Sequence, residues 1–237
     1  MNKVFITGGS GFIGTNFIYH CIGKGYTIMN YDNLTYAGNE NNLQSIKNKQ
    51  NYTFIKGDIC DHNLLYDCII NFNPNYIVNF AAESHVDRSI DGPQNFIYTN
   101  ILGTYHLLET SLKYFNQNKD KKFKLLHIST DEVFGSLSDN KNLFNENSRY
   151  NPSSPYSASK ASSDHLVNAW IKTYNFPAII TNCSNNYGPY QYPEKLIPLI
   201  IQRCISEDEL PVYGNGKNIR DWIYVEDHCD ALFQVLN

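Results

Sequence analysis

Short apolar runs alternate along the chain with longer segments in which apolar residues recur at helical spacing. The short runs are rich in β-branched and aromatic residues, which is typical of strands. We expect strands at Lys3–Thr7, Tyr26–Asp32, Tyr52–Asp58, Tyr76–Ala82, Phe123–Thr130 and Ala178–Asn185. We expect helices at Gly11–Lys24, Asn63–Asn71, Pro93–Tyr114 and Tyr156–Tyr174. Because the expected strands are continuously apolar and alternate with helices, the pattern predicts an α/β fold, a doubly wound parallel sheet covered on both faces.

The pattern loosens after this sheet. We expect one domain over residues 1–185 and a partial, smaller lobe over 186–218, with a short helix near Glu194–Ser206. A strand at Ile219–Val225 and a helix at Glu226–Leu236 are expected to bring residues 219–237 back to the first domain. The chain stops at Asn237 inside a helical pattern and without a capping glycine, which makes this end abrupt.

Composition narrows the function classes. The net charge is −4 and no run of Lys or Arg occurs, which argues against a nucleic-acid partner bound through a basic surface. No apolar stretch is long enough for a bilayer, so we expect no membrane partner. The six cysteines are scattered without a Cys-x-x-Cys pair, which favours a reduced, cytoplasmic protein. The histidines show no metal-ligand spacing, and we predict no metal site.

A glycine-rich turn follows the first expected strand. The sequence from Thr7 reads Thr-Gly-Gly-Ser-Gly-Phe-Ile-Gly, ending at Gly14, and it opens the first expected helix. Glycine permits positive φ and lets a pyrophosphate approach the backbone, while the helix N-terminus directs free N–H groups at that anion. Alone, the motif also fits a tight turn without a ligand. Its position in a βαβ unit favours a Rossmann-type dinucleotide site formed by Gly8, Gly11, Phe12, Ile13 and Gly14.

Two carboxylates end the next two expected strands. Asp32 lies about twenty residues beyond the glycines, where a carboxylate accepts hydrogen bonds from a ribose 2′-hydroxyl and repels a 2′-phosphate. We therefore predict NAD rather than NADP. Asp58, with Ile59, is placed to meet the adenine, although an ordinary aspartate at a strand end is nearly as good an interpretation.

Tyr156 and Lys160 lie four residues apart, on one face of an expected helix. A phenol is a poor base at neutral pH, but an ammonium one turn away, aided by a nicotinamide cation, favours the phenolate. Tyr156 could then take a proton from a sugar hydroxyl while that carbon is oxidised. An exposed tyrosine and a solvated lysine are the alternative, which the preceding dinucleotide motif makes the weaker one.

Asp131 and Glu132 follow the carboxyl end of the strand expected at Phe123–Thr130. Open α/β sheets bind ligands at that edge. Adjacent acids in different environments can divide the work of removing one proton and delivering another, which a dehydration needs. Asp131 would then be protonated and Glu132 ionised. Without the other motifs, two solvated loop charges would be the better interpretation.

At these residues the chain resembles the extended short-chain dehydrogenase/reductase family, and within it the nucleotide-sugar 4,6-dehydratases that act on dTDP-glucose or UDP-glucose. The acid pair is specific to the dehydratases, because the related 4-epimerases lack it. The other matching segments are 7–14, 32–39, 81–89, 156–160, 185–189, 193–198 and 220–222.

The resemblance implies a hydro-lyase that recycles NAD internally. Tyr156 and Lys160 with Thr130 would serve the oxidation of C4, Glu132 would remove the C5 proton, Asp131 would protonate the departing C6 hydroxyl, and C6 would then be reduced. Further contacts with NAD are implied for Asn33, Leu34, Thr35, Phe80, Ala81, Ala82, Ser84, Thr99, Tyr156, Lys160 and Asn186. Contacts with the nucleoside-diphosphate-glucose substrate are implied for Ser84, Thr130, Asn185, Lys195, Leu196, Pro211, Tyr213 and Arg220.

Lys195 and Arg220 suit a diphosphate, although surface charge is the stronger interpretation outside the resemblance. The resemblance also implies a homodimer through the helices near Pro93–Tyr114 and Tyr156–Tyr174, and a product used for a 6-deoxysugar such as rhamnose. Family members continue past residue 237, so the substrate lobe is expected to lack its remainder. A 4-epimerase of the same fold and a non-catalytic NAD-binding fragment stay open as alternatives.

Overall fold

A computed structural model describes residues 2–119, 122–137, 143–212 and 214–237. Its centre is a six-stranded sheet of order β3-β2-β1-β4-β5-β6 in which every neighbouring pair is parallel. The strands are β1 (Lys3–Thr7), β2 (Thr27–Asp32), β3 (Tyr52–Lys56), β4 (Tyr76–Asn79), β5 (Lys124–Thr130) and β6 (Ala178–Cys183). The predicted doubly wound fold class is therefore confirmed, with the strand order reversing beside β1.

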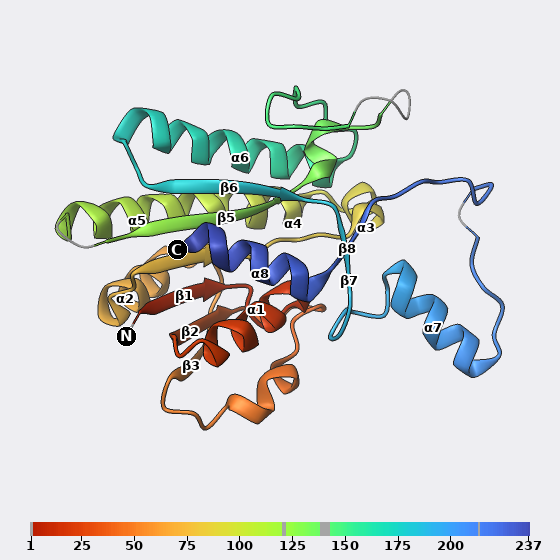
Figure 1. Ribbon diagram of the computed structural model, residues 1–237. Coiled ribbons are helices and arrows are strands. Elements are labelled where there is room, and N and C mark those ends of the chain that lie inside the picture. Colours follow the sequence, from red (N-terminus) through yellow and green to blue (C-terminus); the bar gives the residue numbers. More distant parts are fainter. Residues whose placement is uncertain (1, 120–121, 138–142, 213) are drawn as a thin grey trace.

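Helices cover both faces of this sheet (Figure 1). On one face lie α1 (Phe12–Gly23), the 3₁₀ helix η1 (Glu40–Ile46) and α8 (Val225–Leu236); on the other lie α2 (His62–Phe72), α5 (Thr104–Gln117) and α6 (Pro155–Tyr174). Because side chains alternate along a strand, Val4 and Ile6 of β1 join the first hydrophobic cluster and Phe5 joins the second. The sheet is thus buried on both sides.

The single helix expected at Pro93–Tyr114 is a run of three elements. After α3 (Val86–Asp91), the chain forms α4 (Gln94–Phe96), the π-helix η2 (Ile97–Gly103) and then α5, which continues to Gln117. The π-helix buries Asn100, whose side chain bonds the main chain of Glu83 and the hydroxyl of Ser159. These bonds join the segment after β4 to α6, and π-helical turns are frequent at functional sites.

The chain leaves the sheet after β6. The strand expected at Ala178–Asn185 is divided at Ser184, and β7 (Asn185–Tyr187) pairs instead with β8 (Trp222–Tyr224), which is shorter than the expected Ile219–Val225. Between them, α7 (Leu196–Ser206) projects from the body of the molecule and buries none of its residues (Figure 1). The division into domains at residues 185 and 218 stays a prediction.

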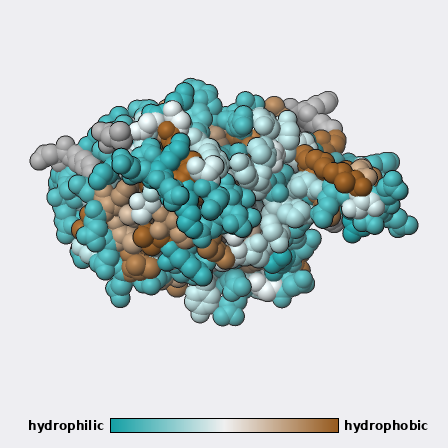
Figure 2. All heavy atoms as spheres, turned by 90° about the horizontal axis from the view of Figure 1, so that it is seen from below, coloured by the Kyte–Doolittle hydropathy of each residue, from teal (hydrophilic) through white to brown (hydrophobic). Residues whose placement is uncertain are grey.

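Hydrophobic side chains gather on the projecting lobe (Figure 2). Ile201 and Ile205 of α7 and Val212 beyond it are all exposed.

The last helix, α8, returns to the sheet and packs beside α1 through Cys229 and Leu232. No helix within the described ranges is both long and apolar enough to cross a bilayer.

Candidate active site

The glycine turn packs more tightly than any side chain would allow. Gly8 has a φ of +69°, and a Cβ there would lie 2.5 Å from the Ala81 nitrogen. A Cβ on Gly14 would lie 2.4 Å from the Gly8 oxygen. Gly11 is the N-cap of α1 and supplies no side-chain cap, so the first N–H groups of the helix stay open to an anion. Phe12 and Ile13 in that first turn pack against the core beside them.

Asp32 is held at the end of β2 by two backbone donors. Its Oδ2 accepts from the Ser10 N–H and its Oδ1 from the Leu34 N–H, both at 2.8 Å. Burial raises the pKa of this carboxyl, while the two hydrogen bonds oppose the rise. The carboxylate therefore ties the glycine turn to Leu34 and Thr35, and each oxygen keeps a lone pair for a ribose hydroxyl. Together with the uncapped helix, this arrangement fits NAD.

The predicted adenine contacts are less open. One Asp58 oxygen accepts from the Cys60 N–H and the other from the Asn33 side chain, each at 2.8 Å. The Ile59 side chain is buried in the second hydrophobic cluster and meets Gly103. The Asp58 carboxylate thus organises the turn, and the Ile59 side chain is taken up by the core. Their role with adenine stays a prediction.

The segment after β4 borders the glycine turn. Phe80 donates its N–H to the Thr7 oxygen at 3.0 Å, and the Ala81 backbone lies against Gly8. Farther on, the Ser84 carbonyl accepts from the Lys195 ammonium at 3.2 Å. The segment from Phe80 to Ser84 therefore runs from the glycine turn to Lys195, whereas Thr99 lies on the π-helix η2.

Tyr156 and Lys160 are placed by a well-capped helix. Ser154 and Ser157 form a reciprocal capping box at the start of α6, with Pro155 as its first residue. The Tyr156 ring is buried and meets Phe96 edge-on at a centroid distance of 6.3 Å. The Lys160 ammonium, also buried, donates to the Ile128 carbonyl at 2.8 Å. Both side chains therefore approach the end of β5.

The acid pair follows β5 directly. Asp131 and Glu132 begin the 3₁₀ helix η3 (Asp131–Phe134), which Thr130 caps by accepting the Glu132 N–H at 3.2 Å. The Thr130 hydroxyl also contacts an Asp131 oxygen at 3.3 Å and hydrogen-bonds with Tyr156. The structure therefore brings Thr130, both acids and the phenol into one group.

Protonation within this group follows from burial. Burial, then the charge of Glu132, raises the pKa of Tyr156, so the phenol is neutral in the chain by itself. Burial raises the pKa of Asp131, and Asp221 adds to the rise. Burial and then Asp131 raise the pKa of Glu132, but Lys195 and Arg220 oppose them. Two cations thus favour an ionised Glu132, the state expected of the base.

The structure brings only some of the residues predicted in the smaller lobe close to the acid pair. Lys195 and Arg220 act on Glu132, and the Asn185 N–H donates to the Asp221 carbonyl at 3.2 Å. Asn186 is buried, and His228 of α8 lies 2.8 Å from its side-chain oxygen. Leu196, by contrast, is exposed, and Pro211 lies in the segment beyond α7. Tyr213 lies outside the described residues.

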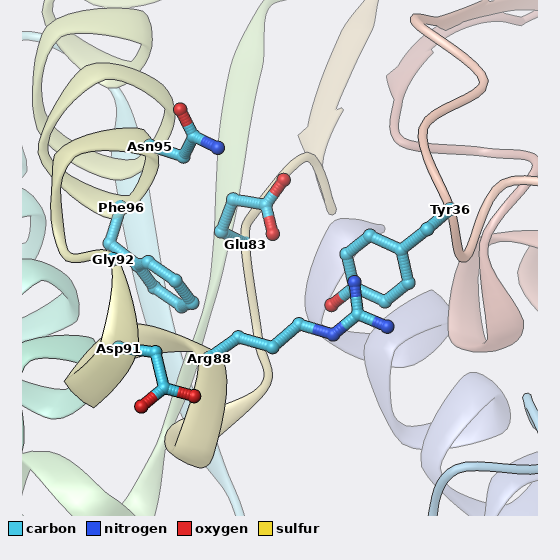
Figure 3. A pocket seen from close by; sticks show the side chains of 7 residues that line it. All are labelled: Tyr36, Glu83, Arg88, Asp91, Gly92, Asn95 and Phe96. Atoms are coloured by element: carbon cyan, nitrogen blue, oxygen red, sulfur yellow. The ribbon is translucent and has the colours of Figure 1, made fainter.

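A cavity of about 340 Å³ is lined by Phe96 (Figure 3), whose ring also meets Tyr156. The Arg88 guanidinium stacks on Tyr36 at 3.8 Å from the ring centroid and reaches Glu194 at 3.2 Å. Arg88, held in this way by Tyr36, fixes the position of Glu194, the residue directly before Lys195. The cavity is lined by Tyr36, Glu83, Arg88, Asp91, Gly92, Asn95 and Phe96, none of which the sequence had indicated as a site residue.

The structure adds residues that sequence reasoning missed. Asp164 lies one turn beyond Lys160 on α6, and Cys183 raises the pKa of Tyr156. Asn100 joins α6 to the segment after β4. Only Asp164 had a readable signal, because it continues the four-residue spacing of Tyr156 and Lys160.

Replacing Gly14 by Ala should weaken NAD binding at least about ten-fold, or about 1.4 kcal/mol. The added Cβ would meet backbone atoms of Gly8 and Gly9, which forces the turn open. Gly23→Ala is the matched control on the same helix, since its Cβ meets nothing within 4 Å. Calorimetric titration with NAD measures both; equal affinities in the two variants would contradict the role of the turn.

Comparison with known proteins agrees with the geometry of the site. The family model of GDP-mannose 4,6 dehydratase matches residues 5–237. The dTDP-glucose 4,6-dehydratase of Escherichia coli is 52% identical over 246 residues, covering 99% of this chain and 68% of that protein. The probable dTDP-glucose 4,6-dehydratase of Sinorhizobium fredii is 49% identical, covering 99% and 67%. The chain therefore spans about two thirds of the length of these relatives.

Solved structures give the same picture. The dTDP-glucose 4,6-dehydratase of Bacillus anthracis in complex with NAD superposes with a TM-score of 0.90 at 47% identity, covering 100% of this chain and 72% of that one. The UDP-glucose 4-epimerase of Thermus thermophilus, also with NAD, reaches 0.89 at only 26% identity, covering 99% and 74%. The fold is therefore common to both kinds of enzyme, and the sequence is what separates them.

Proposed function

Because the chain belongs to the GDP-mannose 4,6-dehydratase family, we propose that it is an NAD-dependent hydro-lyase that converts dTDP-glucose to the 4-keto-6-deoxy sugar. The observation that carries this proposal is the group formed by Thr130, Asp131, Glu132 and Tyr156 at the end of β5. Relatives about half identical bear this activity in their names, which favours dTDP-glucose over UDP-glucose.

The phenol and its neighbour would act on the sugar at C4. Thr130 positions the C4 hydroxyl, and Tyr156 takes its proton. Lys160 holds a positive charge in the buried space beside them. Bound NAD would accept a hydride from C4 and return one to C6. The positive charge of its ring would also favour the ionised form of Tyr156, which burial disfavours in the chain by itself. Gly8, Gly14 and Asp32 would hold it.

The acid pair would then eliminate water. A C4 ketone acidifies the C5 proton, which ionised Glu132 removes. As the C5–C6 double bond forms, the C6–oxygen bond breaks and Asp131 gives its proton to the departing hydroxyl, which leaves as water. The different surroundings of the two acids support this division, since Lys195 and Arg220 restrain the rise in the pKa of Glu132, whereas Asp221 adds to the rise in the pKa of Asp131. The same two cations would meet the substrate diphosphate.

We also propose that the chain forms a homodimer through η2, α5 and α6. Apolar and aromatic side chains are exposed along η2, α5 and α6: Ile97, Tyr98, Leu102, Tyr105 and Tyr174. An exposed strip of this kind is typical of a protein interface. Light scattering should give about twice the chain mass of 27.2 kDa; a monomer at all concentrations would contradict the proposal.

The test of the function is a paired incubation with NAD. The chain is given dTDP-glucose or UDP-glucose, and the sugar nucleotide is followed by mass spectrometry for its mass and by NMR for the configuration at C4. Loss of one water from dTDP-glucose is expected. An unchanged mass with inverted C4 configuration would identify a 4-epimerase, and an unaltered sugar despite bound NAD would identify a non-catalytic fragment. Faster loss of water from UDP-glucose would overturn the choice of base.

A further inference from the structure

Two opposite charges are buried on α6 below the reacting group. Lys160 is only 4% exposed and Asp164 is fully buried. They lie four residues apart, on one face of the helix. A buried charge without an opposite charge is costly, and removing one partner of such a pair leaves the other uncompensated. Each of these residues therefore needs an opposite charge inside the protein.

Asp164 is built to remain ionised. Its Oδ2 accepts from the Ser129 hydroxyl at 2.7 Å, from the Tyr150 hydroxyl at 3.0 Å and from the Asn182 amide at 3.4 Å. Burial alone would raise the pKa of Asp164, but His127, Lys160 and Ser129 outweigh burial and hold it below its ordinary value. These donors come from β5, β6 and the loop before α6.

The ring beside Asp164 is neutral. The Asn79 oxygen accepts from the Thr7 hydroxyl at 2.6 Å, so its amide nitrogen donates to His127 Nδ1 at 3.0 Å. His127 therefore carries its proton on Nε2, which lies 3.2 Å from the Ser163 hydroxyl and 3.4 Å from Asp164 Oδ1. Burial, then the charge of Lys160, lowers the pKa of His127. The histidine does not neutralise Asp164.

Apart from Asp164, the groups that act on the pKa of Lys160 carry no full negative charge near neutral pH, and the acids of η3 are not among them. From β6, Cys183 faces it, and burial raises the pKa of that thiol to about 11. From α6 itself, Tyr156 is a neutral phenol, and Tyr150 of the preceding loop is held neutral because burial raises its pKa. Asp131 and Glu132 of η3 act on Tyr156, and η2 contributes the uncharged Asn100. Burial lowers the pKa of Lys160, and Asp164 is the largest opposing influence.

We propose that Asp164 is a positioning residue, the buried counter-charge that keeps the Lys160 ammonium protonated while its bond to the Ile128 carbonyl holds it near Tyr156. The effect of Asp164 on catalysis rests on the proposed function, whereas its effect on the charge of Lys160 does not. Ser129, Tyr150 and Asn182 hold the carboxylate in place, and α6 sets its spacing from the lysine.

Affinity for NAD as a function of pH tests the counter-charge without turnover. Lys160 is predicted to contact the cofactor, and a charged donor binds more strongly than a neutral amine. In Asp164→Asn, Lys160 loses its proton at lower pH, so calorimetry should show the alkaline fall in affinity, roughly ten-fold, beginning at lower pH than in the wild type. Asp164→Glu should restore the wild-type profile. Tyr150→Phe removes a hydrogen bond but no charge, and its profile should follow the wild type.

Stability gives a second measurement that remains informative if Asp164→Asn folds poorly. Lys160→Met and Asp164→Asn should each lower the urea midpoint, whereas the double variant should lose less than the sum of both. Losses that simply add, or an unshifted pH profile in folded Asp164→Asn, would overturn the inference. A wild-type chain that binds NAD but leaves dTDP-glucose unchanged would overturn only the proposed function.

Discussion

Glu132→Gln should stop the reaction after oxidation at C4. The amide cannot remove the C5 proton, and loss of one positioned acid–base group costs about 10²–10⁴-fold in rate. Mass spectrometry should then find a sugar nucleotide lighter by two hydrogens in place of one lighter by a water. Incubation in deuterated water adds a second measurement, since the wild type should incorporate deuterium at C5 and the variant should not.

The control for this change is Glu226→Gln. Glu226 is an exposed acid in the first turn of α8, so the same carboxyl-to-amide exchange there alters charge without touching the acid pair. Water loss at the wild-type rate in Glu132→Gln would contradict the assigned role. Loss of all oxidation in that variant would instead indicate that Glu132 serves the first step.

The same residue sets the acid side of the pH profile. Burial raises the pKa of Glu132 above its ordinary value of 4.5, and the base works only when ionised. The rate of elimination is therefore expected to fall as the pH decreases through this raised pKa. Lys195 and Arg220 restrain the rise in the pKa of Glu132, so the rate should begin to fall at a lower pH when both cations are present.

The parts of the site that lie close in sequence were predictable, because local geometry determines them. The glycine turn and Asp32 were read from spacing alone, and the Ser10 N–H indeed meets Asp32 at 2.8 Å. The same holds for the acid pair, since residues that follow a parallel strand must lie at the ligand-binding edge of the sheet. Spacing on a helix likewise placed Tyr156 and Lys160 on one face.

Contacts between distant segments could not be read in this way. Neither periodicity nor spacing relates Arg88 to Tyr36, or Glu194 to Arg88. The first pair depends on how α3 packs against the loop after β2, and the second on how the lobe docks on the sheet. The π-helix is a further example: it runs without interruption into α5, so the apolar pattern of the two together suggested one regular helix. Asn100 was missed for that reason.

Burial was the other missing quantity. Spacing suggested that Lys160 lowers the pKa of Tyr156, but both groups are buried, and burial dominates the pKa of each. The phenol of the chain alone is therefore protonated, and a bound cation is needed to change that. A sequence gives the identity of such groups but not the solvent around them, which decides their charge.

Tyr156→Phe should abolish proton removal at C4 and lower the rate of the first step by about 10²–10⁴-fold. The phenyl ring keeps the edge-on contact with Phe96, so the helix and the NAD affinity should be nearly unchanged. Unlike Glu132→Gln, this variant should return an unaltered sugar nucleotide, because nothing downstream can begin. Stopped-flow measurement of the first step and calorimetry with NAD separate the two effects.

Tyr76→Phe is the matched control for that change, since it removes a hydroxyl from another buried tyrosine, on β4, within the hydrophobic core. Its first step should keep the wild-type rate. If Tyr156→Phe lost NAD binding as well as rate, the phenol would belong to the cofactor site more than to the chemistry. If it kept the wild-type rate, the base must be a different group, and Thr130, which hydrogen-bonds with the phenol at the end of β5, would be the residue to replace next.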